Sequence, residues 1–268
     1  MNVATLGPKG TFSHEAVKKY DPEAKIIFKD TIYDVFDSVK SKESELGIVP
    51  LENSISGTVG ITVDCLQKFN LKIQKEIIVP VKHNLASYVP LNKIKNIYTT
   101  LQAYEQCEIY LRKNLPKSEI TFTNSNSLSA QKLSQKKGDA AAIVPSTAED
   151  LNGVKIIEEG IQDSKNNVTR FILIGDGFTQ PTGNDRTSIS IIPNVDKPGL
   201  LYSLLGEFSN RKINLSKIES RPAKGKLGDY VFYIDLIGHK DDEKVKDAFT
   251  AIEKNFILKV LGSYPREY

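Results

Sequence analysis

Three polar stretches carry the side chains best suited to chemistry, and each adjoins a strand-like segment. Residues 7–13 (GPKGTFS) and 52–59 (ENSISGTV) each follow an apolar run and precede a helix-like pattern. Glycines let the backbone turn sharply there, and the free N–H groups at a helix start attract anions. Two such turns are suited to hold a carboxylate between backbone N–H and hydroxyl donors. The third stretch, residues 167–171 (NVTRF), enters a strand and sets a hydroxyl beside a guanidinium.

Each stretch also has a purely structural interpretation. The first is compatible with a tight turn and a helix N-cap, and the second with a capping loop in which Thr58 is the N-cap. The third is compatible with the solvated start of a strand. The residues alone leave these alternatives open.

The usual devices of metal and nucleophilic catalysis are absent from the sequence. The three histidines, His14, His83 and His239, are scattered and lack metal-ligand spacing. The sequence contains no G-x-S-x-G elbow, Walker loop or G-x-G-x-x-G fingerprint. We therefore expect no metal and no cofactor, and a chemistry that depends on neutral donors and positioned charges.

The elements that must position these stretches alternate between strand and helix. Strands are expected at residues 3–6, 26–28 and 46–49, and helices at residues 13–20 and from Thr31 onward. The alternation restarts after Pro80, with strands expected at 97–99, 120–122, 140–144 and 169–174 and helices at 102–111 and 128–133. Such alternation is typical of mostly parallel sheets covered by helices. Two lobes in tandem predict a cleft, where small ligands bind.

A second domain is expected after a linker at residues 175–184, which contains three glycines and one proline. Beyond it the expected order is strand, helix, strand, strand, helix, strand, typical of a ferredoxin-like βαββαβ module. The first strand is expected at 187–192. The two middle strands are expected at 215–219 and 229–236, joined across Gly225 and Gly228.

The composition excludes several classes of protein. The 268 residues have a net charge of +3 with basic residues spread along the chain, so we expect no nucleic-acid partner. Cys65 and Cys107 are expected to be buried free thiols. No apolar run approaches the ~20 residues of a membrane span, and no signal peptide is visible. We expect a cytoplasmic protein with no membrane partner.

The motifs, taken together, resemble those of prephenate dehydratases in order and spacing. The matching segments are residues 7–13, 49–54 with 57–59, 161–163 and 167–171, and the C-terminal module resembles the attached ACT domain through residues 198–201 and 219–222. The resemblance implies a two-lobed catalytic domain like type II periplasmic binding proteins, over residues 1–178. It also implies an ACT regulatory domain over 185–268. The implied activity is decarboxylating dehydration of prephenate to phenylpyruvate.

The resemblance also implies roles for individual residues. Thr169 is expected to donate a hydrogen bond to the leaving hydroxyl, and Arg170 to pair with a carboxylate or brace the cleft. Asn53 and Ser54 are assigned to the catalytic set. The residues expected to contact substrate are Thr11, Gly57, Thr58 and Phe171.

Regulation by L-phenylalanine is implied by the ACT-like module. ACT modules usually pair with a second copy, so a homodimer or homotetramer is expected. Backbone N–H groups at a helix start suit the effector's carboxylate, and a neighbouring strand would receive its ammonium group and side chain. The expected effector residues are Gly199, Leu200, Leu201, Asn214, Leu215, Ser216, Glu219 and Ser220.

Two other functions stay open from the sequence. An arogenate or cyclohexadienyl dehydratase would act on a substrate with an ammonium in place of the keto group. A non-catalytic amino-acid sensor would use the same two-lobed fold and ACT module without any reaction.

Overall fold

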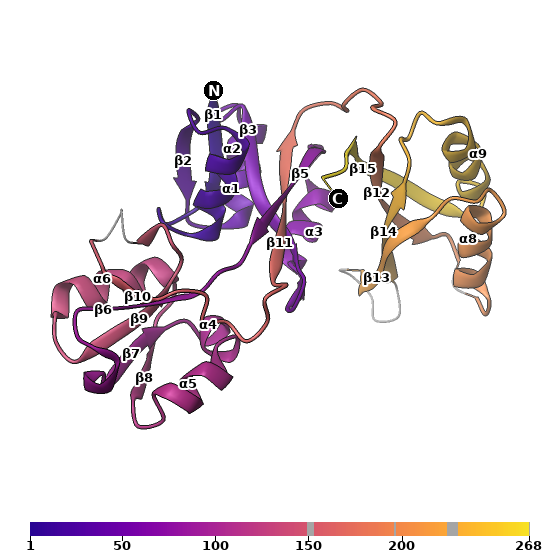
Figure 1. Ribbon diagram of the computed structural model, residues 1–268. Helices are drawn as coiled ribbons and strands as arrows, with labels where there is room; N and C mark the ends of the chain where they lie inside the picture. The colour runs from indigo at the N-terminus through magenta and orange to yellow at the C-terminus, as the bar shows by residue number, and fades with distance from the viewer. Residues whose placement is uncertain (149–152, 196, 224–229, 268) are drawn as a thin grey trace. The chain divides into compact units, whose positions relative to one another are not determined.

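The computed structural model describes residues 1–148, 153–195, 197–223 and 230–267 (Figure 1). These residues form two compact units. The first unit consists of Met1–Thr62 and Ile77–Phe171, and the second of Val63–Glu76 and Ile172–Tyr268.

The N-terminal part of the first unit is a parallel sheet with the order β2-β1-β3. Its strands are β1 (Asn2–Leu6), β2 (Lys25–Lys29) and β3 (Leu46–Asn53), and its helices are α1 (Phe12–Tyr20) and α2 (Ile32–Lys40). The predicted cap of α2 is confirmed, because Thr31 Oγ1 accepts from Asp34 N at 3.1 Å. The apolar residues at helical spacing, Ile32, Val35, Phe36 and Val39, are all buried.

The second part of the first unit is a five-stranded sheet with the order β10-β6-β9-β7-β8. Its strands are β6 (Asn84–Ser87), β7 (Asn96–Thr99), β8 (Glu119–Phe122), β9 (Ala140–Val144) and β10 (Ile156–Glu158). Its helices are η1 (Leu91–Lys93), α4 (Leu101–Glu105), α5 (Glu108–Asn114) and α6 (Asn126–Lys136).

The side chains of this sheet alternate between two cores, as the two-residue period of strands requires. Ile97 and Ile143 pack with the buried residues of α4 and α5. Their neighbours Tyr98 and Ala142 pack with the buried residues of α6. Figure 1 shows α6 and the pair α4 and α5 on opposite sides of the sheet.

The predicted single helix over residues 102–111 is wrong, because the chain forms α4 and α5 with a break at Gln106 and Cys107. Ala103, Cys107 and Leu111 are buried in the same core. Cys107, with φ −122° and ψ 13°, starts the second helix without a side-chain cap. The break leaves Gln106 between the two helices.

Two strands, β5 (Lys72–Pro80) and β11 (Val168–Gly175), contribute residues to both units. The short strand β4 (Gly57–Thr58) pairs with the end of β3, and helix α3 (Gly60–Lys68) follows it. Thr58 is therefore a strand residue, and its interpretation as the N-cap of the next helix is wrong.

The second unit contains the predicted βαββαβ module. Its elements are β12 (Asp185–Pro193), α8 (Leu200–Ser209), β13 (Leu215–Pro222), β14 (Tyr230–Ile237), α9 (Glu243–Ile252) and β15 (Phe256–Pro265). The order in the sheet is β13-β14-β12-β15, with antiparallel neighbours, and β15 then pairs with β5. The joint at Gly225 and Gly228 and the strand residue Asp229 lie outside the described residues.

The two faces of the second unit's sheet are covered by different parts of the sequence. Ile189, Ile191 and Ile234 pack with α8 and α9. On the other face, Ser190 Oγ donates to Gln67 Oε1 of α3 at 2.7 Å. Most of α3 and the first half of β5 thus belong to the second unit, although the sequence places them before the linker.

Candidate functional site

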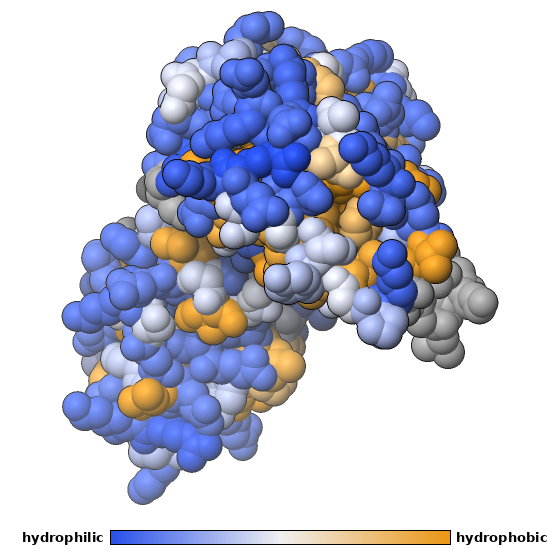
Figure 2. Space-filling model, turned by 90° about the vertical axis from the view of Figure 1, so that its right-hand side faces the viewer, coloured by the Kyte–Doolittle hydropathy of each residue, from blue (hydrophilic) through white to orange (hydrophobic). Residues whose placement is uncertain are grey.

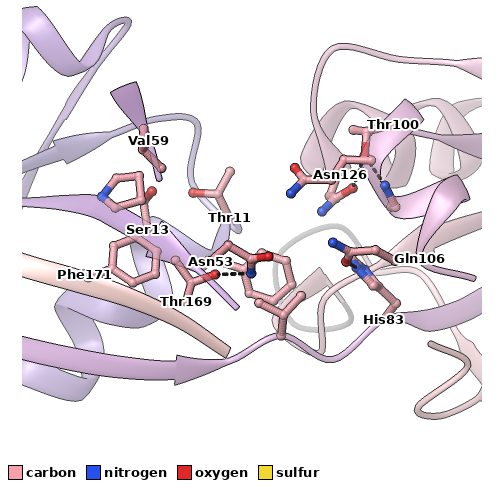
Figure 3. Close-up of a pocket in the computed structure, with 15 residues that line it drawn as sticks. Thr11, Ser13, Asn53, Val59, His83, Thr100, Gln106, Asn126, Thr169 and Phe171 are labelled. Atoms are coloured by element: carbon pink, nitrogen blue, oxygen red, sulfur yellow. Dashed lines mark hydrogen bonds between the residues drawn. The ribbon is translucent and has the colours of Figure 1, made fainter. Parts of the chain in front are cut away.

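A pocket of about 240 Å³ lies in the first unit, between segments that are far apart in the sequence (Figure 3). This volume is close to the ~300 Å³ at the lower end of the range for small-molecule sites. The lining residues are Thr11, Phe12, Ser13, Pro50, Asn53, Val59, Val81, His83, Thr100, Gln102, Ala103, Gln106, Asn126, Thr169 and Phe171.

The lining is electrically neutral but rich in hydrogen-bonding groups. None of the lining residues is an Asp, Glu, Lys or Arg. Helix α1 begins next to its N-cap Thr11, helix α4 begins next to its N-cap Thr100, and helix α6 begins at Asn126, so the N-termini of these three helices reach the pocket. The partial positive charge of a helix N-terminus favours anions. The pocket is therefore suited to an acidic small molecule, bound by dipoles instead of full charges.

Asn53, at the end of β3, is held in one orientation by the backbone. Its Oδ1 accepts from Ile55 N at 3.0 Å and from Ser56 N at 2.9 Å. Its Nδ2 therefore faces the other way, and it donates to Thr169 Oγ1 at 2.9 Å. Figure 3 shows this bond at the edge of the pocket.

Strand β11 presents Thr169 and Phe171 to the pocket and turns Arg170 away, because successive side chains of a strand point to opposite faces. Thr169 is 8% exposed and Arg170 is 4% exposed. The Arg170 guanidinium pairs with Glu52 Oε2 at 3.0 Å. Arg170 was expected either to pair with a carboxylate or to brace the cleft. In the structure its charge pairs with a carboxylate of the protein itself, that of Glu52.

A chain of buried polar side chains continues from Asn53 to His83. Asn53 Nδ2 donates to Asn167 Oδ1 at 2.8 Å, and Asn167 Nδ2 donates to Gln106 Oε1 at 2.8 Å. His83 Nε2 lies 2.8 Å from the same Gln106 oxygen. These hydrogen bonds connect the N-terminal sheet with the five-stranded sheet along the wall of the pocket.

The predicted substrate residues separate into two groups. Thr11, Asn53, Thr169 and Phe171 line the pocket, whereas Ser54, Gly57 and Thr58 are not among the lining residues. The Ser54 hydroxyl binds backbone instead, since it accepts from Val168 N at 3.0 Å and donates to Asn166 O at 3.2 Å. Gly57 has φ +78°, a conformation that glycine adopts without strain.

The structure adds lining residues that the sequence reasoning missed, chiefly Gln106, Thr100 and Asn126. Thr100 Oγ1 caps α4 and donates to Asn126 Oδ1 at 3.3 Å. Isolated Gln and Asn residues have no distinctive spacing in the sequence. Thr100 and Asn126 each stand two residues before an expected helix, whereas Gln106 stands inside one, so the sequence held no signal for Gln106.

Burial perturbs the ionisable groups around the pocket. It lowers the pKa of His83, although the contact with Gln106 opposes the shift. Burial also lowers the pKa of His14, with further contributions from Lys9 and Lys18. Burial and Asp163 raise the pKa of Cys107 to about 12, so its thiol stays protonated at neutral pH. Among the described residues, no three His, Cys, Asp or Glu side chains gather closely enough to hold a metal ion.

The predicted effector residues lie in the second unit, on two faces of its sheet. Gly199, with φ +82°, precedes α8, and the Leu200 side chain is buried in the core beneath that helix. The Leu200 N–H donates to Lys197 O at 3.2 Å, so it is already engaged.

The strand residues of the effector set divide between those faces. Ser220 pairs with Phe232, and Leu215 with Leu236, on the face covered by α8 and α9. Glu219 lies on the opposite face, where its carboxylate is 3.4 Å from Arg221 Nη1 and 3.7 Å from Lys217 Nζ.

Of the remaining effector residues, Leu201 is exposed on α8, and Asn214 and Ser216 contact the neighbouring strand β14. The Ser216 hydroxyl donates to Asp235 O at 3.4 Å, and Asn214 O accepts from Ile237 N at 2.9 Å. Within a single copy of the protein, the predicted effector residues therefore do not surround one binding site.

Comparisons with known proteins cover nearly the whole chain. The family model described as prephenate dehydratase matches residues 3–178, and the ACT domain model matches residues 191–254. A prephenate dehydratase of Methanocaldococcus jannaschii is 40% identical over 268 residues, covering 96% of each protein. A bifunctional chorismate mutase/prephenate dehydratase of Aquifex aeolicus is 39% identical, covering 99% of this chain and 74% of that protein.

Solved structures give the same result. The crystal structure of a prephenate dehydratase from Arthrobacter aurescens, in complex with L-Phe, matches with a TM-score of 0.92 and 33% identity. The match covers 99% of this chain and 90% of that one. As for membrane insertion, no helix within the described residues is long and apolar enough to span a bilayer.

Proposed function

This chain belongs to the prephenate dehydratase family, and on that premise we propose that it converts prephenate to phenylpyruvate, CO2 and water under regulation by L-phenylalanine. The reaction belongs to the carbon–oxygen lyases, and its place is the cytoplasm. Residues 1–178 form the catalytic domain in this proposal, and residues 185–268 form the ACT regulatory domain.

The observation that carries the proposal is the direction of the bond between Asn53 and Thr169. Because the Asn53 amide nitrogen donates to Thr169 Oγ1 at 2.9 Å, the threonine oxygen acts there as an acceptor. The hydroxyl proton of Thr169 is therefore left for a second partner, and Thr169 lines the pocket. A neutral donor in that position is what departure of the 4-hydroxyl of prephenate requires.

In the proposed reaction, the bond between the ring and its carboxylate breaks and its electron pair enters the ring. The bond to the 4-hydroxyl breaks with its pair on oxygen, and this oxygen leaves as water after gaining one proton from solvent. Thr169 stabilises the departing oxygen with its hydrogen bond. A single well-placed donor of this kind contributes about 3 kcal/mol to the transition state.

The absence of charged side chains from the pocket lining favours the loss of CO2 from the ring of prephenate. A ring carboxylate against apolar groups such as Phe171 and Val59 is poorly solvated, and poor solvation favours its conversion to neutral CO2. The side-chain carboxylate of prephenate is assigned to Thr11 and the start of α1, beside Asn53. Contacts from Ser54, Gly57 and Thr58 to substrate stay predictions, as does any contact from Arg170.

For regulation, we assign the effector to the predicted set around Gly199 and Glu219. Because that set is split between two faces of the sheet, a second copy of the module is proposed to complete the site. Strand β13 lies at the edge of the described sheet, and an unpaired edge is a template for another strand.

Exposed apolar residues of the second unit support a homodimer or homotetramer. Figure 2 shows patches of apolar residues, in orange, on a mostly hydrophilic surface. In the second unit the exposed large apolar residues include Leu201 and Tyr202 on α8 and Ile218 on β13. Such residues are candidates for burial between copies.

The test is incubation of the purified protein with prephenate, following phenylpyruvate by its absorbance in alkali, with and without L-phenylalanine. Phenylpyruvate formation that L-phenylalanine suppresses is the expected result. Formation without suppression would remove the regulatory half of the proposal. Formation only from arogenate would identify an arogenate dehydratase, and no product from either substrate would favour an amino-acid sensor.

A further inference from the structure

The hydrogen bonds that link Asn53, Asn167, Gln106 and His83 along the pocket can run in only one donor-to-acceptor direction. Their starting point is the pair of backbone N–H groups of Ile55 and Ser56, which can only donate. They fix Asn53 Oδ1 as the acceptor, so the Asn53 nitrogen must face Asn167. Asn167 therefore presents its oxygen to Asn53 and its nitrogen to Gln106.

The direction carries through Gln106 to the imidazole of His83. Gln106 Oε1 accepts from Asn167 Nδ2 at 2.8 Å, and His83 Nε2 lies at 2.8 Å from the same oxygen. An oxygen that already accepts one bond can be paired with that nitrogen only if the nitrogen carries a proton. His83 is thus in the Nε2–H form.

The other imidazole nitrogen shows that His83 is neutral. His83 is 2% exposed, and its Nδ1 is buried without a hydrogen-bond partner in the described part of the chain. A proton there would create a buried charge and an unpaired donor, both of which are costly. The lowered pKa of His83, caused mainly by burial, agrees with this.

We infer that His83 is a positioning residue for the proposed reaction: its Nε2–H helps to hold the Gln106 oxygen in the wall, so that the Gln106 nitrogen faces the pocket as a donor. The inference rests on the proposed function. Figure 3 shows the Gln106 nitrogen directed into the pocket and its oxygen beside His83. Within the described residues, that nitrogen has no hydrogen-bond partner, so it is available to a ligand.

The second donor to Gln106 matters because an amide can rotate by 180°. Held only by Asn167, Gln106 would present its oxygen to the pocket for part of the time. An oxygen facing a substrate with two carboxylates and a keto group repels it, whereas the N–H2 group binds it. His83 acts on the substrate through Gln106, because it keeps the N–H2 group of that amide facing the pocket.

The tautomer is tested by NMR on the full-length protein labelled with 15N-histidine. The His83→Gln variant identifies the His83 signals among those of the three histidines. At neutral pH the expected spectrum has His83 neutral, with the proton on Nε2. A proton on Nδ1, or an imidazolium at neutral pH, would overturn the inference whatever the activity of the protein.

The positioning role is tested by kcat/KM for prephenate in matched variants. His83→Phe removes the N–H and keeps a ring beside Phe12, whose ring centroid lies 5.8 Å away. We expect a loss of about 10- to 100-fold, less than the 10²–10³ of deleting a direct donor. His83→Gln keeps an N–H near the Nε2 position and should recover most of the loss.

A double-variant comparison separates positioning from a general structural effect. In a Gln106→Leu background, adding His83→Phe should cause little further loss of kcat/KM, because the group that His83 positions is gone. An equal loss in both backgrounds would overturn the positioning role. If the unaltered protein does not turn over prephenate, the proposed reaction fails, and the NMR result still decides the orientation.

Discussion

Two buried polar clusters in this chain differ in charge and in whether they face a pocket. The pocket cluster in the first unit, from Thr169 through Asn53 and Gln106 to His83, is neutral and leaves groups that face the pocket. The second unit instead buries a full ion pair, with Arg186 Nη1 2.7 Å from Glu76 Oε2 and exposures of 2% and 0%. Glu76 also accepts from the backbone N–H of Glu267 at 2.8 Å.

The difference shows how burial serves two purposes. A buried charge must be matched within the protein, so a cluster such as Arg186 and Glu76 has a structural role. Neutral amides and hydroxyls cost less to bury, and a cluster built from them can keep donors for a ligand. We expect changes in the ion pair to affect stability, and changes in the pocket cluster to affect turnover.

The largest expected effect comes from breaking the ion pair. Glu76→Gln removes the carboxylate that lies 2.7 Å from Arg186 Nη1, and removal of one partner of such a buried pair typically costs about 3–5 kcal/mol. Urea unfolding measures the loss, and Glu253→Gln, at an exposed position of the same unit, is the control. The double variant Glu76→Leu with Arg186→Met should recover much of the stability. A loss below about 1 kcal/mol in Glu76→Gln would contradict the comparison.

In the pocket cluster, Asn53→Asp should abolish most of the turnover. A carboxylate still accepts from Ile55 N and Ser56 N but cannot donate to Thr169, so the Thr169 proton turns toward residue 53. The expected loss in kcat/KM for prephenate is about 10²–10³. Asn166→Asp, which adds the same charge at an exposed neighbouring position, is the control. Similar losses in both variants would mean that charge alone is responsible.

A smaller effect on stability is expected at Lys259. Like Arg186, Lys259 has its charge matched within the protein, so we expect it to have a structural role. Its ammonium donates to Leu66 O at 3.0 Å and to Gln67 O at 2.6 Å, at the C-terminal end of α3. Lys259→Met should cost about 1–2 kcal/mol, the range for a partly buried cation at a helix C-terminus. Urea unfolding against the exposed Lys254→Met control measures it. Equal midpoints would show that this cap contributes nothing.

The smallest expected effect is a pH dependence of stability from His83. Because burial lowers its pKa in the folded state, the unfolded chain binds more protons. Stability should therefore fall as the pH drops below about 6.5 toward the lowered pKa, with a slope of at most about 1.4 kcal/mol per pH unit. Urea midpoints at several pH values should show a shallower fall in His83→Gln. An identical fall in both proteins would assign the effect to other groups.

Local patterns predicted much of the fold. The cap at Thr31, the buried face of α2 and the βαββαβ order all follow from short-range spacing, and the structure confirms them. The assignment of α3 to the second unit was not predictable, because its partners, such as Ser190 and Lys259, lie more than a hundred residues away. The register shift between Leu215 and Lys217 was also missed, and it places Leu215 on the face of Ser220 instead of the face of Glu219.

The site was predictable only where residues form compact motifs. Thr11, Asn53, Thr169 and Phe171 belong to such motifs and line the pocket. Gln106 and His83 do not, because their importance comes from a network that joins residues 23 to 116 positions apart. The orientation of an amide depends on its partners, so it is visible only after the chain has folded.

The most direct test of the account compares Thr169→Ala and Thr169→Ser for turnover of prephenate and for urea unfolding in the same preparations. We predict that Thr169→Ala lowers kcat by about 10²–10³ with little change in the unfolding midpoint. Thr169→Ser should retain more activity, because it keeps the donor. Near-normal turnover in Thr169→Ala would contradict the central claim that this hydroxyl assists the leaving group.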